Sequence, residues 1–128
     1  MDYSTVVKRR ASTKPTAEGG WNIFLTWWNG MSSSDPVGNL AVGASCEKAY
    51  PGWPCDAAHQ ALIDEFGRTV DLAKRKEIAI EIQESAMKLV PYVPLGMWYQ
   101  PVALSPRLKN VINVPGAMVF WGATKAGK

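Results

Sequence analysis

The sequence predicts a mixed α/β fold, on the evidence of three features spread along its 128 residues. Residues 21–28 are rich in aromatic and β-branched side chains and predict a buried strand. Two helical patterns follow, within residues 56–67 and 71–89. Residues 93–104 are apolar and extended, and a short strand is expected over residues 119–121. So few strands make a thin sheet, since roughly five or six are typical, and part of the fold is expected to lie outside this chain.

The first half of the chain is predicted to hold little regular structure besides the strand. Residues 3–11 indicate a short helix or entry segment, and residues 13–20 a loop. Residues 29–54 contain repeated Gly, Pro and Ser, which predicts a long irregular loop.

Both predicted helices begin at an aspartate. Asp56 and Asp71 are suitable N-caps, because a carboxylate accepts from free amides of the first turn. Gly67 is expected to end the first helix and Pro91 to stop the second. The expected buried faces are Ala58, Leu62 and Phe66 on the first helix, and Ile78, Ile82, Ala86 and Leu89 on the second.

Composition excludes several classes of protein. Hydrophobic residues make up 47% and charged residues 20%, an ordinary globular balance, and the net charge is +3. The one basic cluster, residues 8–10, reads as a solvated face, so no nucleic-acid partner is expected. No apolar run approaches the ~18 residues of a membrane span, and no signal peptide is recognised. These features suit a cytoplasmic protein or an internal piece of a longer chain.

Cys46 and Cys55 flank a turn-rich segment containing Pro51, Gly52 and Pro54. This arrangement favours a disulfide formed in an oxidising compartment. Three alternatives remain open at this point. The cysteines could be free thiols, they could bind zinc together with Asp56 and His59, or Cys55 and His59 could act as nucleophile and base.

Other catalytic arrangements find little support. His59 is the single histidine, and a partly exposed helical histidine is the better interpretation of it. Glu77 and Glu81 lie on one helix without apolar surroundings that would tune a general acid. We therefore expect no enzyme activity, no metal and no cofactor.

Several stretches, taken in order, resemble the C-terminal part of the periplasmic solute-binding proteins of bacterial ABC importers, of the dipeptide/oligopeptide/nickel type (extracellular solute-binding family 5). The resemblance covers nearly the whole chain. It is carried by "GGWNIFLTWW" (19–28), Asp35-Pro36, Asn39, "GWPCD" (52–56), the helix-to-strand passage of residues 62–98 and "RLKNVINVPGAMVFW" (107–121).

This resemblance implies a two-lobe α/β protein that closes on a solute. Residues 1–98 would form the end of the second lobe, and residues 99–128 the crossover and tail that return to the first. The implied protein is periplasmic, captures a small peptide-like or related solute and delivers it to an ABC permease, while an upstream part of the chain supplies the missing strands. The family often has a disulfide after the Asp-Pro pair, which supports the pairing of Cys46 with Cys55.

In the peptide-binding members, the loop before the Asp-Pro pair contributes a carboxylate that holds the ligand's amino group. Residues 29–34 have no carboxylate, and Asp35 is expected to cap its own turn. The resemblance thus leaves a neutral or differently charged solute open. The expected ligand-contacting residues are Trp27, Trp28, Asn29, Met31, Ser32, Met97, Trp98 and Tyr99, although Trp27 and Trp28 could equally belong to the lobe core.

Two other functions stay possible on the sequence alone. Six tryptophans could form the binding platform of a small aromatic-rich module, for instance for carbohydrate. A thiol enzyme using Cys55 and His59 is the less favoured alternative. A fragment of a lobe would also expose apolar edges, so a homo-oligomer is expected for the chain alone.

Overall fold

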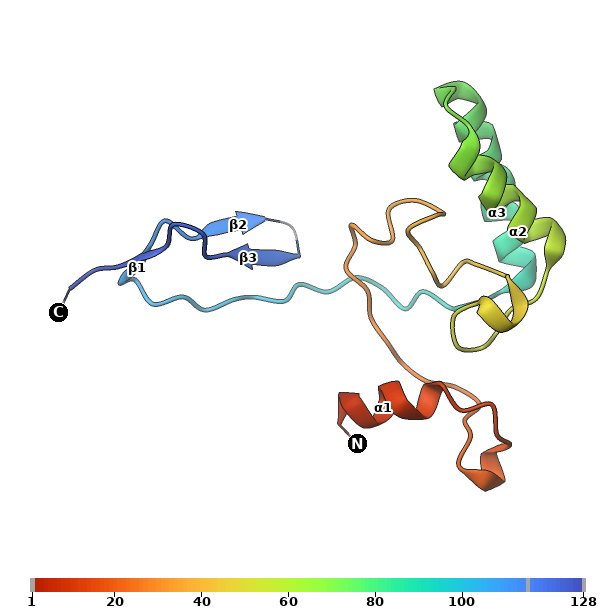
Figure 1. Cartoon of the computed structure of the whole chain (residues 1–128), viewed down its shortest axis with the longest axis horizontal. Coiled ribbons are helices and arrows are strands. Elements are labelled where there is room, and N and C mark those ends of the chain that lie inside the picture. Colours follow the sequence, from red (N-terminus) through yellow and green to blue (C-terminus); the bar gives the residue numbers. More distant parts are fainter. Residues whose placement is uncertain (1, 115, 128) are drawn as a thin grey trace.

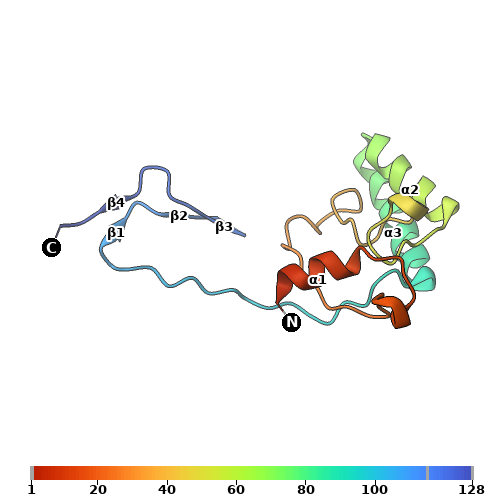
Figure 2. The ribbon, with the colours of Figure 1, turned by 60° about the horizontal axis from the view of Figure 1, so that its bottom comes forward.

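The computed structural model describes residues 2–114 and 116–127, and within them the chain is mixed α/β. Three α-helices lie in the first two thirds of the chain, and four short strands lie in the last fifth. Figure 1 shows the helices gathered at one end, with the C-terminal strands projecting away on an extended segment. Figure 2, turned by 60°, shows the same separation. None of the helices in the described residues is long and apolar enough to cross a membrane.

Helix α1 (Tyr3–Arg10) confirms the short helix predicted at the start of the chain. The Asp2 carboxylate caps it by accepting from the Thr5 amide at 3.0 Å. Hydrogen bonds from the Ser4 hydroxyl, and then from Thr5, hold the pKa of Asp2 well below its ordinary value. At the other end of α1, the Trp21 indole donates to the carbonyl of Arg10 at 2.9 Å, which ties the helix to the chain after it.

Helices α2 (Ala57–Arg68) and α3 (Leu72–Leu89) form the packed body of the protein. Asp56 and Asp71 cap them as predicted, by accepting from the amides of His59 and Lys74. Gly67 does not end α2, which continues to Arg68. Val90 closes α3 in the left-handed conformation, with φ of 49°, directly before Pro91.

The buried face of α2 is rotated by one residue from the predicted one. His59, Ile63 and Phe66 are buried, whereas Ala58 is exposed and Leu62 only partly covered. Ile78 and Ile82 of α3 are buried as expected. The difference arises because the irregular loop packs Val42 against the two helices as part of the core. The periodicity of a helix gives no information about a loop residue of this kind.

His59 is fully buried, which corrects the prediction of a partly exposed side chain. Its Nε2 lies 2.8 Å from the Val42 carbonyl oxygen, and its Nδ1 lies 2.9 Å from Ser85 Oγ. A carbonyl oxygen only accepts, so Nε2 donates to Val42, while Nδ1 pairs with the serine hydroxyl. The imidazole thereby joins the loop, α2 and α3.

Cys46 and Cys55 form a disulfide, which confirms the predicted bond and overturns the alternatives of free thiols, zinc ligands and a thiol nucleophile. The Cys46 amide donates to the Pro54 carbonyl at 2.9 Å, and Ser45 and Cys55 form an isolated β-bridge. A short 3-10 helix, Cys46–Lys48, lies inside the closed loop. Before it, Ala41, Val42 and Ala44 are buried, so this loop contributes part of the core.

Residues 21–28 are extended but form no strand, contrary to the prediction of a buried one. Among the described residues, no hydrogen bond involves their backbone groups. The side chains of Ile23 and Leu25 are 85% and 72% exposed, whereas Phe24 packs on Trp21 and Tyr50. Composition favours a strand here, but the described chain provides no neighbouring strand to pair with it.

The C-terminal part forms two small antiparallel sheets rather than one final strand. Strand β1 (Leu108–Lys109) pairs with β4 (Thr124–Lys125), and β2 (Ile112–Val114) pairs with β3 (Ala117–Val119). Of the predicted strand at residues 119–121, only Val119 belongs to a strand. Residues 93–104 are extended as predicted, and no strand of the described chain pairs with them.

The disulfide yields a stability prediction. Native protein should show no titratable thiols without reductant. Replacing both cysteines by serine should lower the free energy of unfolding by about 2.5–3 kcal/mol, because the bond closes a short loop. Denaturant titration measures the change. Two thiols titrating in unreduced native protein would contradict the structure.

The buried histidine yields a second prediction. Exchanging His59→Leu should lower the free energy of unfolding by about 1–3 kcal/mol, since the Val42 carbonyl loses its donor while buried. Ser85→Ala should cost about 1 kcal/mol through the loss of one hydrogen bond. The exposed Glu81→Ala serves as a control, and thermal unfolding followed by circular dichroism compares the three. Equal stability of His59→Leu and Glu81→Ala would show that the hydrogen bonds of His59 to Val42 and Ser85 do not stabilise the fold.

The unpaired segment yields a third prediction. The chain alone should self-associate, because residues 21–28 expose apolar side chains and free backbone groups without charge or proline to block pairing. Leu25→Lys should shift light-scattering mass toward the monomer, while Val70→Lys, at a site 94% exposed between α2 and α3, should not. A monomeric parent chain at high concentration would overturn this expectation.

Candidate functional site

An exposed cluster of three aromatic rings brings together two of the segments predicted to contact a ligand. Trp27 and Trp98 meet edge-to-face, with ring centroids 6.1 Å apart and planes at 88°. Tyr3, at the start of α1, stacks on Trp27 with centroids 6.2 Å apart and planes at 28°. Trp27 remains 51% exposed and Trp98 60% exposed. The strand-like segment and the segment after α3 therefore share one aromatic surface.

Trp28 lies on the opposite side of the extended segment from this cluster. Its ring packs on Tyr50, with centroids 4.8 Å apart, and the Arg10 guanidinium lies over the Tyr50 ring at 5.0 Å from its centroid. Arg10 also donates to the Tyr50 hydroxyl. Successive side chains of an extended segment point to opposite faces, so Trp28 anchors the segment to the disulfide loop while Trp27 faces out.

The loop after Trp28 is organised by its own polar groups. The Asn29 carbonyl accepts from the hydroxyls of Ser32 and Ser33, and Asn29 Oδ1 accepts from the Met31 amide at 3.0 Å. Asp35 Oδ1 accepts from the amides of Val37 and Gly38, which confirms Asp35 as a turn cap. The Met31 side chain is 62% exposed, and Ser32 is exposed too.

Asn29 connects this loop to the C-terminal hairpin. A Cβ built on Gly116, in the turn between β2 and β3, would lie 1.6 Å from Asn29 Nδ2. The Asn29 side chain would have to shift to admit a Cβ there, and the φ of 82° at Gly116 itself favours glycine. The predicted residue Asn29 therefore lies beside the hairpin turn as well as in the loop.

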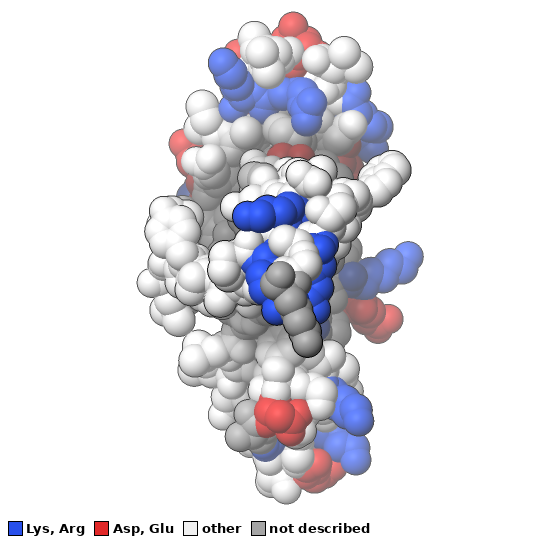
Figure 3. Space-filling model, turned by 90° about the vertical axis from the view of Figure 1, so that its left-hand side faces the viewer, with Lys and Arg blue, Asp and Glu red and all other residues white. Residues whose placement is uncertain are grey.

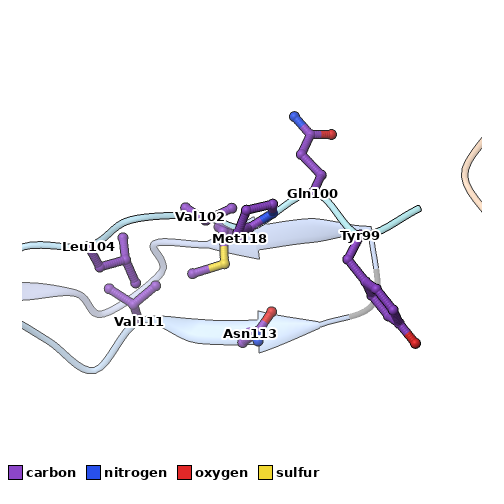
Figure 4. A pocket seen from close by; sticks show the side chains of 8 residues that line it. Tyr99, Gln100, Val102, Leu104, Val111, Asn113 and Met118 are labelled. Carbon is purple, nitrogen blue, oxygen red and sulfur yellow. The ribbon is translucent and has the colours of Figure 1, made fainter.

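Met97 and Tyr99, on either side of Trp98, are almost fully exposed and touch no other aromatic ring. Tyr99 lies at the mouth of a hollow of about 380 Å³ between residues 99–104 and the β2–β3 hairpin. Figure 4 shows Val102, Leu104 and Val111 gathered around Met118 in this hollow, with the Tyr99 ring pointing away from them. The hollow is lined by polar as well as apolar groups, with Gln100 and Asn113 beside the aliphatic side chains.

A second hollow, of about 520 Å³, lies between α1 and residues 20–25. Arg9 and Arg10 line it, but their guanidinium groups are engaged, Arg9 with the Gly20 carbonyl at 3.1 Å and Arg10 with Tyr50. These arginines are therefore occupied in holding α1 against the rest of the chain.

No group of acidic, cysteine or histidine side chains in the described part of the chain is arranged to hold a metal ion. Figure 3 shows basic and acidic side chains as separate small groups on the face it displays, without a continuous patch of one sign. A broad electrostatic surface of the kind that binds nucleic acid is not seen there.

Sequence reasoning missed Tyr3 and Tyr50, which support Trp27 and Trp28 respectively. Both lie far from the tryptophans along the chain, so no local motif could pair them. For Trp27 and Trp28 a signal was available in the predicted extended segment, because successive side chains of an extended chain point to opposite faces.

Comparison with known proteins gives one informative similarity. The chain is 31% identical over 126 residues to a probable peptide ABC transporter periplasmic-binding protein of Sinorhizobium fredii. The alignment covers 98% of this chain but 23% of that protein, so the chain spans about a quarter of the relative's length. No protein-family model matches the sequence. The similarity therefore supports a segment of a periplasmic-binding protein.

Proposed function

We propose that this chain is part of a two-lobed solute-binding protein that captures a small solute in the periplasm and delivers it to an ABC import permease. The observation that carries the proposal is the Trp27–Trp98 contact, because it joins the two segments predicted to face the solute. The similarity to the Sinorhizobium fredii periplasmic-binding protein along nearly the whole chain supports the same class. Because that relative is a probable peptide-binding protein of an ABC transporter, a peptide is the first solute to test.

The proposed division is residues 1–98 in the second lobe and residues 99–128 in the crossover and tail of the first. Supporting it, the extended segment after α3 leaves the helical body and carries the hairpins away from it (Figures 1 and 2). Tyr99 and the residues after it contact the β2–β3 hairpin around the smaller hollow. In a two-lobed protein, a solute held near Trp98 would lie beside this crossover.

The remaining part of such a protein would complete the sheet that this chain leaves open. Within the described part of the chain, the backbone of residues 21–28 has no backbone partner and its apolar side chains are exposed, and neighbouring strands would satisfy and cover both. The relative is about four times as long as the matching segment, which leaves ample chain for these strands. The permease partner and the periplasmic location follow from this same proposal.

One alternative has a specific observation in its favour. Trp27, Trp98 and Trp121 are 51%, 60% and 88% exposed, as expected of an aromatic-rich interaction or carbohydrate-binding module. A sugar-binding platform, however, uses rings that lie flat beneath the sugar, and the two tryptophans in contact stand at 88° to each other. We therefore rank solute binding first.

The test uses the whole polypeptide that contains this chain. A panel of di- and tripeptides and related small solutes is screened by thermal shift, because a ligand that binds the folded state raises its melting temperature. Binding by at least one solute, together with recovery of the protein in the periplasmic fraction, is expected. A cytoplasmic protein that no member of the panel stabilises would contradict the proposal.

The same protein gives a mutational prediction. Trp27→Ala and Trp98→Ala should each weaken solute binding by about 2 kcal/mol or more, as the loss of an aromatic anchor commonly does. Trp28→Ala and Trp21→Ala should lower stability and leave the affinity of the folded fraction nearly unchanged, since both rings pack on the disulfide loop. Trp121→Ala is the matched surface control. Calorimetric titration measures all five, and equal affinities throughout would show that other residues line the cleft.

A further inference from the structure

We propose that the corner formed by the rings of Trp27 and Trp98 binds an organic cation of the methylated-ammonium class through cation–π contacts. The inference rests on the proposed function and names the class of solute that this site takes. It is carried by the geometry of the rings, by their exposure and by the distribution of charge around them.

The first argument is the angle between the rings. Two planes at 88° with centroids 6.1 Å apart present two surfaces that a compact, round group can touch at once. A flat sugar or aromatic ring can lie against only one of them. Both indoles keep at least half of their surface open after making this contact. Tyr3 stacks on Trp27 and limits how far its ring can turn.

The second argument is charge. Residues 19–34 and 89–106, which contribute the two tryptophans, contain no charged side chain. One charged neighbour of Tyr3 is Asp2, whose exposed carboxylate stays ionised because the hydrogen bonds from Ser4 and Thr5 lower its pKa. The basic residues of α1 lie in its last turn. The surroundings of the corner therefore favour a cation over an anion.

The third argument selects the kind of cation. A primary ammonium is compact and strongly hydrated, and it needs a carboxylate or several acceptors to replace its water. Residues 29–34 have no carboxylate, and the hydroxyls of Ser32, Ser33 and Ser34 donate to backbone carbonyls of the same loop. A methylated ammonium is weakly hydrated and places its methyl groups on the indole faces, the best aromatic partners for a cation. The corner suits this group better than a free peptide amino group.

The experiment uses the 128-residue chain with ¹⁵N-labelled tryptophan, and nuclear magnetic resonance to follow the six indole N–H signals separately. The probes are tetramethylammonium, choline and the neutral isostere of choline, in which carbon replaces the ammonium nitrogen. Sodium chloride at matched ionic strength corrects for salt. We expect both cations to shift the signals of Trp27 and Trp98 with millimolar affinity, and the isostere to bind at least tenfold more weakly.

Three variants sharpen the test. Trp27→Ala and Trp98→Ala should each abolish the shift of the remaining partner, whereas Trp121→Ala, which removes an exposed indole elsewhere, should leave both shifts unchanged. Equal binding of the isostere would overturn the cationic class while leaving a solute site at the corner. Absence of shifts at Trp27 and Trp98, or an equal shift at Trp121, would overturn the corner as a binding site. Neither result alters the thermal-shift test of solute binding by the whole protein, so failure of the two proposals is distinguishable.

Discussion

The buried imidazole of His59 is the interaction on which the rest of the structure depends. It holds the Val42 carbonyl of the irregular loop and the Ser85 hydroxyl of α3 at the same time, from its own position on α2. Val42 thereby joins Ile63, Phe66, Ile78 and Ile82 in the one core cluster of the described chain. The disulfide then closes the loop beyond Val42, so the loop acts as a rigid extension of the helix pair. Two aromatic residues of this loop support residues 21–28, because Trp21 packs on Trp53 and Trp28 packs on Tyr50.

The parts of the fold that local chemistry determines could be predicted from the sequence. The caps at Asp56 and Asp71, the stop at Pro91, the turn at Asp35 and the disulfide each depend on a few neighbouring residues, and all are found. The buried faces were less predictable. Helical periodicity gave the right face of α3 but missed His59, because a buried histidine needs partners from distant segments that no periodicity reveals.

The candidate site also combines features that local sequence predicts with features that depend on contacts between distant segments. The composition of residues 21–28 indicated a strand, but a strand also requires partners, and the described chain offers none. Trp27 and Trp98 could each be predicted from the sequence as ligand-contacting residues. Their contact with each other and the stacking of Tyr3 on Trp27 could not, because both depend on how three distant segments fold together. The opposite orientations of Trp27 and Trp28 follow from the pleat of an extended chain. Fixing Trp28 on Tyr50 necessarily directs Trp27 outward, so the packing of one tryptophan sets the exposure of the next.

The segment that carries Trp98 adds a further physical constraint. Pro91, Pro94 and Pro101 fix φ at three points and remove three amide donors, so this segment can run extended without strand partners at little energetic cost. Gly96 interrupts this stiffness with a φ of 141°, a conformation that other residues rarely adopt, two residues before Trp98. Rotation about Gly96 would change the direction of the C-terminal arm relative to the helical body. Pro94 and Pro101 each fix their own φ on either side of this glycine, so the stretch between them is the part of the segment that can change direction, and a two-lobed protein that closes on its solute needs such a joint near its crossover.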